Sequence, residues 1–126
     1  MFGQVTEILL PQANSQPFST ACGADGVYFT EQTGRIGRVN YTTLALTQWP
    51  TPIAKSKPTG IAITASGNVY FAETAIGKIG MMPSGGGLIS EYRLPVPGAF
   101  PDKLAAGADG RIWFTQHDLA GIGAIQ

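Results

Sequence analysis

Three segments of the chain share one pattern of polar and apolar positions: a glycine turn, then a run of β-branched and aromatic residues, then a polar end. They span 24–31, 65–73 and 108–116. Asp-Gly or Ser-Gly supplies the positive φ of a tight hairpin, and the apolar run is typical of a strand. Glu31 and Glu73 lie 42 positions apart, and Phe71 and Phe114 lie 43 apart. A period of this length predicts one supersecondary unit stacked several times, most often a propeller blade.

Each period contains four short predicted strands. One ends in proline, at 6–11, 47–52 and 90–95; the next consists of small residues, at 19–22, 60–63 and 103–106. The turn glycines, Gly26, Gly67 and Gly110, introduce the third, at 27–31, 69–73 and 112–116, and the fourth spans 36–39, 79–82 and 122–125. A loop-closing proline stands nine positions before each turn glycine, at Pro17, Pro58 and Pro101. No segment shows helical periodicity.

Four short strands per period predict an all-β fold of the β-propeller type. The strand of small residues is expected to be the innermost strand, a, because space is scarce where blades converge. The order along the chain is then d-abc, written three times, with repeats at about 5–39, 46–82 and 89–125. The chain is thus one unit, 1–126, of three four-stranded blades.

The strand order leaves two edges without partners. Three blades are fewer than the roughly 4–8 that close a propeller. The first d strand, 5–10, has no blade of its own, and the last c strand, 122–125, has an open edge, which favours aggregation. Strand swapping between copies would cure both defects, so we expect a homodimer of six blades; a homotrimer would give about nine, outside the usual range. A fragment of a longer chain would meet the same edges.

Composition and charge narrow the class of protein. Hydrophobic residues make up 44% and charged residues 13%, which is typical of a globular chain. The formal net charge of zero argues against a nucleic-acid or anionic membrane partner. The single cysteine, Cys22, permits no internal disulfide and is expected to be buried in its small-residue strand. With no leader pattern at the start, the chain is expected to be cytoplasmic.

The repeats resemble those of one enzyme family. The phrases at 24–32, 34–39, 6–11 and 90–98, from Ala-Asp-Gly to Leu-Pro-Val-Pro-Gly, are similar to the blades of virginiamycin B lyases (streptogramin lyases). The resemblance implies a seven-bladed propeller that uses Mg²⁺ and a general base. It also implies the reaction, which opens a cyclic depsipeptide antibiotic by elimination and not by hydrolysis.

The resemblance further implies two recurring site positions around the central opening. One is the residue after the loop-closing proline: Phe18, Thr59 and Asp102, none of them histidine. The other is the end of the third strand and its loop: Glu31 with Gln32, Glu73 with Thr74, and Gln116 with His117.

From these positions we predict His117, the only histidine, as the candidate catalytic base, and Glu31 and Glu73 as candidate Mg²⁺ ligands. The remaining positions are candidate ligand-binding residues: Phe18, Thr59, Asp102, Gln32 and Gln116. The structural alternatives are an ordinary exposed loop histidine, solvated or ion-paired carboxylates, and a blade-packing aromatic.

Two functions from different classes remain open. The first is an oligomerising propeller module whose axial opening binds a small molecule or a cation without turnover. The second is a Mg²⁺-dependent carbon–oxygen lyase acting on streptogramin B-type antibiotics. The missing histidine after each loop-closing proline favours the first function.

Overall fold

Each repeat folds into one antiparallel sheet whose strands follow one another along the chain. The computed structural model describes residues 3–126, and at position 117 the backbone alone. The first sheet contains β1 (Pro17–Cys22), β2 (Gly26–Glu31), β3 (Arg35–Asn40) and β4 (Leu46–Pro50). The second contains β5 (Pro58–Ile63), β6 (Val69–Glu73), β7 (Lys78–Met82) and β8 (Ser90–Arg93). The third contains β9 (Pro101–Ala106), β10 (Ile112–Gln116) and β11 (Gly121–Ile125).

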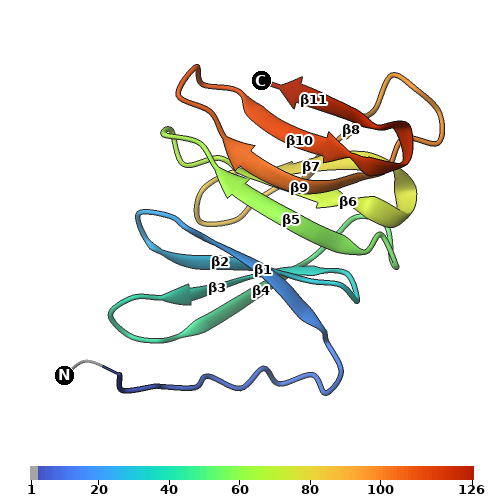
Figure 1. Cartoon of the computed structure of the whole chain (residues 1–126). Helices are drawn as coiled ribbons and strands as arrows, with labels where there is room; N and C mark the ends of the chain where they lie inside the picture. Colours follow the sequence, from blue (N-terminus) through green and yellow to red (C-terminus); the bar gives the residue numbers. More distant parts are fainter. Residues whose placement is uncertain (1–2) are drawn as a thin grey trace.

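The three sheets are stacked like blades, with their first strands side by side (Figure 1). β5 contacts both β1 and β9, which confirms that the small-residue strands are innermost. Two 3-10 turns, η1 (Thr74–Ile76) and η2 (His117–Leu119), link the second strand to the third in the last two sheets. No helix in the described part of the chain is long and apolar enough to cross a membrane. The all-β prediction and the strand order within each sheet are confirmed.

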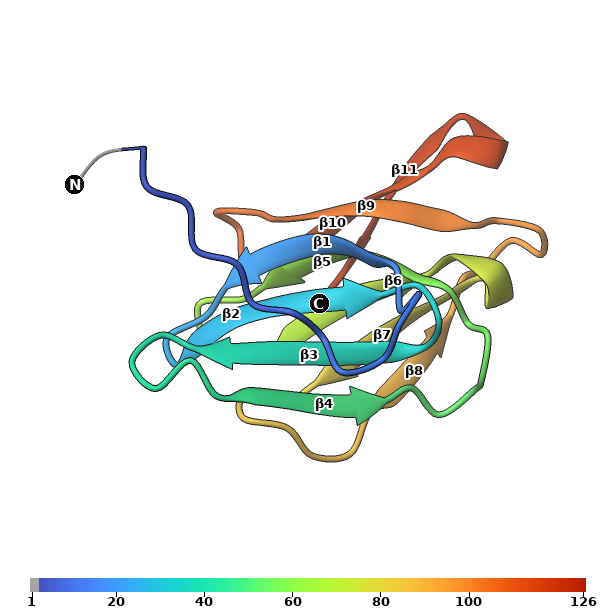
Figure 2. The same cartoon turned by 90° about the horizontal axis from the view of Figure 1, so that it is seen from below.

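The predicted strand at 5–10 is wrong for the chain as described. Residues 4–10 have no regular secondary structure and cross the outside of the first sheet (Figure 2). A strand needs a ladder partner, and the open edge, β11, lies at the other end of the stack (Figure 1). The segment therefore contributes apolar side chains, Ile8 and Leu10, to a groove over the first sheet.

The apolar cores lie between the sheets. Tyr28 and Ile36 of the first sheet pack on Val69, Phe71 and Met82 of the second. The second interface is formed by Ala62, Tyr70, Ile79, Leu94 and Ala99 together with Ile112 and Phe114 of the third sheet. Tyr70 and Ile79 there belong to the faces of β6 and β7 opposite those that meet the first sheet. Each fully buried side chain of this size contributes about 1.5–3 kcal/mol. The strand period of two thus gives every sheet two apolar faces, one for each neighbour.

Cys22 was expected to be buried in its strand, β1, but its side chain is exposed. β5, with a sheet on either side, is almost entirely buried, whereas β1 is largely exposed. The expectation of a buried thiol is wrong because β1 has a described sheet on one side only.

A glycine in each third strand faces a phenylalanine ring of the second strand. Gly37, Gly80 and Gly123 are the cross-strand partners of Phe29, Phe71 and Phe114. A Cβ on these glycines would lie 2.1, 2.3 and 2.3 Å from the ring carbon Cζ. The repeated Ile-Gly dipeptide thus lets each ring lie flat across the neighbouring strand.

The turn glycines behave in two ways. Gly67 and Gly110 have φ of 94° and 84°, which confirms the predicted positive φ. At Gly26 φ is 159°, close to extended backbone, and a Cβ would lie 2.3 Å from the carbonyl oxygen of Val39. Glycine is required there by the close approach of two strands.

Replacing Gly80 by alanine should destabilise the fold by about 1–3 kcal/mol, because the Phe71 ring must leave its low-energy position. The measurement is the free energy of unfolding from urea titration. Gly121→Ala is the matched control, since its Cβ would meet nothing closer than 3.7 Å. Equal stability losses in the two variants would contradict the ring-packing explanation.

Candidate functional site

A β-bulge at the start of each inner strand positions the residue that follows the loop-closing proline. The pairing of the first two strands shifts register between Pro17 and Thr20 and between Pro58 and Ile61, and the third sheet has the same shift after Pro101. Bulges redirect side chains and are common beside functional sites. Phe18, Thr59 and Asp102 therefore all lie on bulges, as equivalent residues of the three sheets.

Threonine hydroxyls of the second strand hold two of these bulges. The backbone N–H of Ser19 donates to Thr30 Oγ1 at 3.2 Å, and the N–H of Lys103 donates to Thr115 Oγ1 at 3.0 Å. Thr30 Oγ1 also donates to the carbonyl oxygen of Thr59 at 2.6 Å. The first bulge is thereby connected to the second sheet.

The residue before the loop-closing proline is held in an unusual conformation. Gln16 and Lys57 both have φ of 58°, which is rare for residues other than glycine. Their carbonyl oxygens accept hydrogen bonds from the N–H groups of Gln32, at 2.9 Å, and Thr74, at 3.1 Å. Strained backbone of this kind costs about 1–3 kcal/mol and is often found at functional sites.

These elements enclose an open cavity of about 420 Å³ between the second and third sheets. Its lining combines the bulge residues with the loops on either side: Lys57, Thr59, Thr74, Ala75, Phe100, Asp102 and Asp118. Thr59 and Thr74 share a hydrogen bond of 2.7 Å between their hydroxyls. We call this space the axial cavity, because it lies where the inner strands begin.

Two threonines connect the sheets along the floor of the axial cavity. Thr59 Oγ1 donates to Thr74 Oγ1, and Thr74 Oγ1 donates to the carbonyl oxygen of Pro101 at 2.7 Å. Thr59 Oγ1 also lies 3.1 Å from the carbonyl oxygen of Asp102. Gly60 lets the two inner strands approach, since a Cβ there would lie 2.2 Å from the same Asp102 oxygen. The backbone under Asp102 is therefore fixed by contacts from the neighbouring sheet.

Gln32 lies in an adjoining cavity of about 440 Å³, between the first and second sheets. Lys57 and Ala75 line both cavities, so the two spaces are neighbours along the same face. Phe18 is placed differently: the ammonium of Lys103 lies 4.1 Å from the centre of its ring. Of the predicted ligand-binding residues, Thr59 and Asp102 thus share one cavity, Gln32 lines the next, and Phe18 stacks with a lysine.

The polar residues that end the second strands point into their own sheets. Glu31 and Glu73 are both 0% exposed. Gln48 Nε2 on β4 donates to Glu31 Oε2 at 2.7 Å, and Arg35 lies 3.6 Å from Oε1. Gln116, the equivalent residue of the third sheet, has its amide nitrogen near Gly123 of β11. With nothing exposed, neither carboxylate reaches the axial cavity, and the predicted Mg²⁺ role of Glu31 and Glu73 stays a prediction.

Glu73 has a second carboxyl group beside it. Burial, and after it the neighbouring carboxyl of Glu91 on β8, raises the pKa of Glu73 to about 8, although Ser56 and Lys78 act in the opposite direction. Lys78 Nζ lies 3.7 Å from Glu91 Oε1. Gln48 of β4 is the equivalent of Glu91 in the first sheet, because each residue pairs with the glycine of its third strand. The first sheet thus has an amide where the second has a carboxyl group. The second sheet therefore places two carboxyl groups side by side, where the first sheet places a carboxyl group beside an amide.

The side chain of His117, the predicted base, lies outside the described residues. Its backbone belongs to η2, and the next residue, Asp118, lines the axial cavity. The loop that carries the only histidine is thus part of the cavity wall.

Four lining residues were missed from the sequence: Lys57, Ala75, Phe100 and Asp118. Lys57 and Phe100 did carry a signal in the sequence, because each directly precedes a loop-closing proline, as Gln16 does in the first repeat. Asp118 follows the predicted position 117 and carried no separate repeat signal.

The chain matches the family model described as the virginiamycin B lyase family over residues 1–126. It superimposes on a catalytically inactive virginiamycin B lyase variant from Staphylococcus aureus with quinupristin, at a TM-score of 0.91 and 32% identity. That match covers 99% of this chain and 43% of the other. A streptogramin B lyase structure superimposes with a TM-score of 0.92 and 28% identity. That match covers 98% of this chain and 42% of the lyase.

A regucalcin from Agrobacterium tumefaciens gives a TM-score of 0.60 at 24% identity, covering 79% of this chain and 37% of that one, and shows the fold alone. A comparison with curated protein sequences gives no match. The chain spans less than half the length of the lyases that it superimposes on.

We expect the fold to lose stability as the pH rises, because of Glu73. Its folded pKa of about 8 lies above the ordinary value of 4.5, so the folded chain binds this proton more tightly than the unfolded chain. The associated stability is present below the ordinary pKa and is lost as the pH rises through the folded pKa. Urea midpoints measured between about pH 5 and about pH 9 should show this fall.

Glu91→Gln is the informative variant for that experiment. It reproduces the carboxylate–amide pair of the first sheet and removes the like charge, so the loss with pH should be smaller than in the parent chain. Superimposable pH profiles for the two proteins would contradict the assignment.

Proposed function

The chain belongs to the virginiamycin B lyase family, and from this premise we propose that its axial cavity binds a cyclic depsipeptide of the streptogramin B type. One observation carries the proposal: the bulge residues Thr59 and Asp102 meet Lys57 in one cavity of about 420 Å³. Small-molecule sites typically enclose about 300–1,000 Å³. A virginiamycin B lyase structure with quinupristin superimposes over 99% of this chain.

The lining suits a cyclic peptide, which presents carbonyl acceptors, N–H donors and apolar side chains around one ring. The ammonium of Lys57 can donate to a carbonyl oxygen, and the carboxylate of Asp102 can accept from an N–H. The Phe100 ring offers an apolar surface beside them. Hydrogen bonds to charged groups contribute about 1.5–3 kcal/mol each, so Lys57 and Asp102 would set the orientation.

Ring opening by elimination is the second candidate, favoured by the position of the His117 loop beside the cavity. In this reaction a base removes the proton from the carbon next to a carbonyl. The electron pair forms a carbon–carbon double bond, the ester carbon–oxygen bond breaks, and the carboxylate leaves. His117 is the imidazole that this chain can supply as the base.

The family resemblance implies Mg²⁺ for that reaction, and the described side chains do not form a complete site for it. Among them no group of three or more His, Cys, Asp and Glu could hold a metal ion. Asp102 and Asp118 are the two carboxylates that line the axial cavity. No step is therefore assigned to a metal, and Mg²⁺ enters the proposal only as a variable of the assay.

Isothermal titration with quinupristin should show binding that Lys57→Asn weakens about tenfold, since one charged hydrogen bond is lost. Lys55→Asn is the matched control. Lys55 has φ of 61°, close to the 58° of Lys57, and asparagine tolerates this backbone conformation at both positions. Lys55 lines only the adjoining cavity and not the axial cavity. Absence of binding, or equal weakening in both variants, would refute the axial cavity as the site.

Chromatography with mass detection, with and without Mg²⁺, separates the two candidate functions. Elimination gives a linear product with the mass of the substrate, whereas hydrolysis adds the mass of one water. A linear product of unchanged mass, lost in His117→Ala with binding retained, would support the lyase. Binding of quinupristin without formation of any product would support the binding module and contradict the lyase.

A further inference from the structure

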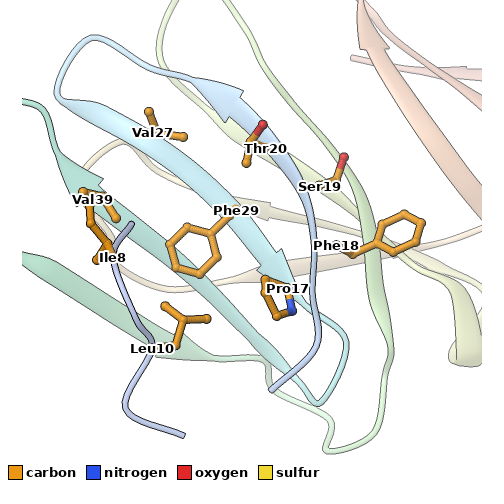
Figure 3. Close-up of a pocket in the computed structure, with 9 residues that line it drawn as sticks. All are labelled: Ile8, Leu10, Pro17, Phe18, Ser19, Thr20, Val27, Phe29 and Val39. Atoms are coloured by element: carbon orange, nitrogen blue, oxygen red, sulfur yellow. The ribbon is translucent and has the colours of Figure 1, made fainter. Parts of the chain in front are cut away.

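The cavities of this chain differ in the charge of their linings. The groove over the first sheet is lined by apolar and hydroxyl side chains (Figure 3). The axial cavity has the carboxylates of Asp102 and Asp118 beside Lys57. The adjoining cavity has Lys55 and Lys57, and none of its described lining residues is acidic. Its lining is therefore positively charged, although the formal net charge of the whole chain is zero.

In the described part of the chain, no carboxylate pairs with these two lysines. The ion pairs found there involve neither Lys55 nor Lys57. Glu31, which directly precedes the cavity residue Gln32, is 0% exposed and has Arg35 3.6 Å from its Oε1. The charge of Glu31 is thus enclosed in the first sheet and has its own counter-charge, so it does not compensate the lysines.

The rest of the lining adds neutral hydrogen-bond donors to the two ammonium groups. The cavity is lined by Gln16, Gln32, Thr33, Lys55, Lys57 and Ala75. Carboxamides and hydroxyls both donate, whereas an ammonium group only donates, so a ligand beside the lysines has to supply acceptors. A negatively charged acceptor makes the stronger hydrogen bond. The volume of about 440 Å³ is typical of a small-molecule site.

Hydrogen bonds fix the loop that carries the lysines. The N–H groups of Thr74 and Ala75 donate to the carbonyl oxygens of Lys57, at 3.1 Å, and Ser56, at 3.0 Å. Ser56 is 0% exposed, and its hydroxyl oxygen lies 3.1 Å from that of Thr51. Because the backbone is already ordered, little conformational entropy is lost when a ligand binds.

The fold needs this loop conformation, but it does not need lysine in it. Lys55 and Lys57 have φ of 61° and 58°. At the equivalent positions of the first repeat, Asn14 and Gln16 have φ of 62° and 58°, and in the third repeat Gly98 has φ of 82°. Asparagine and glycine adopt a positive φ more readily than lysine does. The pair of lysines is therefore a feature of this one cavity and not of the repeat.

We propose that the adjoining cavity binds the anionic group of a small molecule, a carboxylate or a phosphate, which Lys55 and Lys57 hold with Gln32 and Thr33 as neutral donors. The anion would supply the acceptors that the two ammonium groups lack and would reduce the repulsion between them. This site is separate from the axial cavity, and the inference does not depend on streptogramin binding there.

Titration of the isotope-labelled chain with sodium phosphate or sodium acetate, followed by NMR at neutral pH and constant ionic strength, tests the site. The amide resonances of residues 32–33 and 55–57 should shift and saturate with at least one of the two anions. Saturation with phosphate alone would assign a phosphate ligand, and saturation with acetate alone would assign a carboxylate. Shifts that saturate with neither anion, or that map to other parts of the chain, would overturn the proposal.

Variants of the lysines test the named contacts. Lys55→Asn should weaken the anion about tenfold, because one charged hydrogen bond is lost. Lys103→Asn is the matched control, since it removes the same charge and Lys103 lines neither cavity. Lys55→Asn combined with Lys57→Gln has the residues of the first repeat, so it should fold and show no saturation. Equal weakening in Lys55→Asn and Lys103→Asn, or saturation in the double variant, would overturn the site.

Lys55→Asn also separates this proposal from the one for the axial cavity. Its affinity for quinupristin should equal that of the parent chain, because Lys55 does not line the axial cavity, whereas its affinity for the anion should fall. A failed anion titration with quinupristin binding intact would overturn the anion site alone. Anion binding without quinupristin binding would support the anion site and refute only the streptogramin proposal.

Discussion

Packing of each sheet on the next is the interaction on which the rest of this structure depends. Successive residues of β6 alternate between the two neighbours, so that Phe71 packs on the first sheet and Tyr70 on the third. Because both faces of a sheet are apolar, a single repeat cannot bury its own surface. The flat contact also needs the glycine opposite each phenylalanine, because any side chain there would displace the ring. Stacking, and not any single sheet, is therefore the folding unit.

The stacking also determines where the chemistry lies. Inner strands from neighbouring sheets converge, so bulge residues far apart in sequence, such as Thr59 and Asp102, line one cavity. The carboxylates at the other recurring position point back into the sheets and are enclosed there. Glu31 has an amide and an arginine as partners, whereas Glu73 has another carboxyl group and keeps a proton. The same repeat position thus serves different electrostatic roles in adjacent sheets.

Much of the fold could be predicted because its signals are local. The turn glycines, the alternation along the second strands and the loop-closing prolines recur at fixed spacing, and each specifies nearby hydrogen bonding. The candidate site was predicted in part, since the residue after each loop-closing proline lies on a bulge in every sheet. Lys57 and Phe100 were missed although they precede the same prolines, because the positive φ of Lys57 and the shape of the cavity depend on neighbouring sheets.

The sequence by itself determined the repeat, the four-strand order and the direction of each strand, because turns and strand alternation depend on contacts within a few residues. The tertiary structure decided what each residue meets across the stack. It left residues 5–10 without a ladder partner, exposed Cys22 where its counterpart strand is buried, and enclosed Glu73 beside Glu91. Burial and pKa depend on distance to other chain segments, and a one-dimensional pattern does not contain those distances.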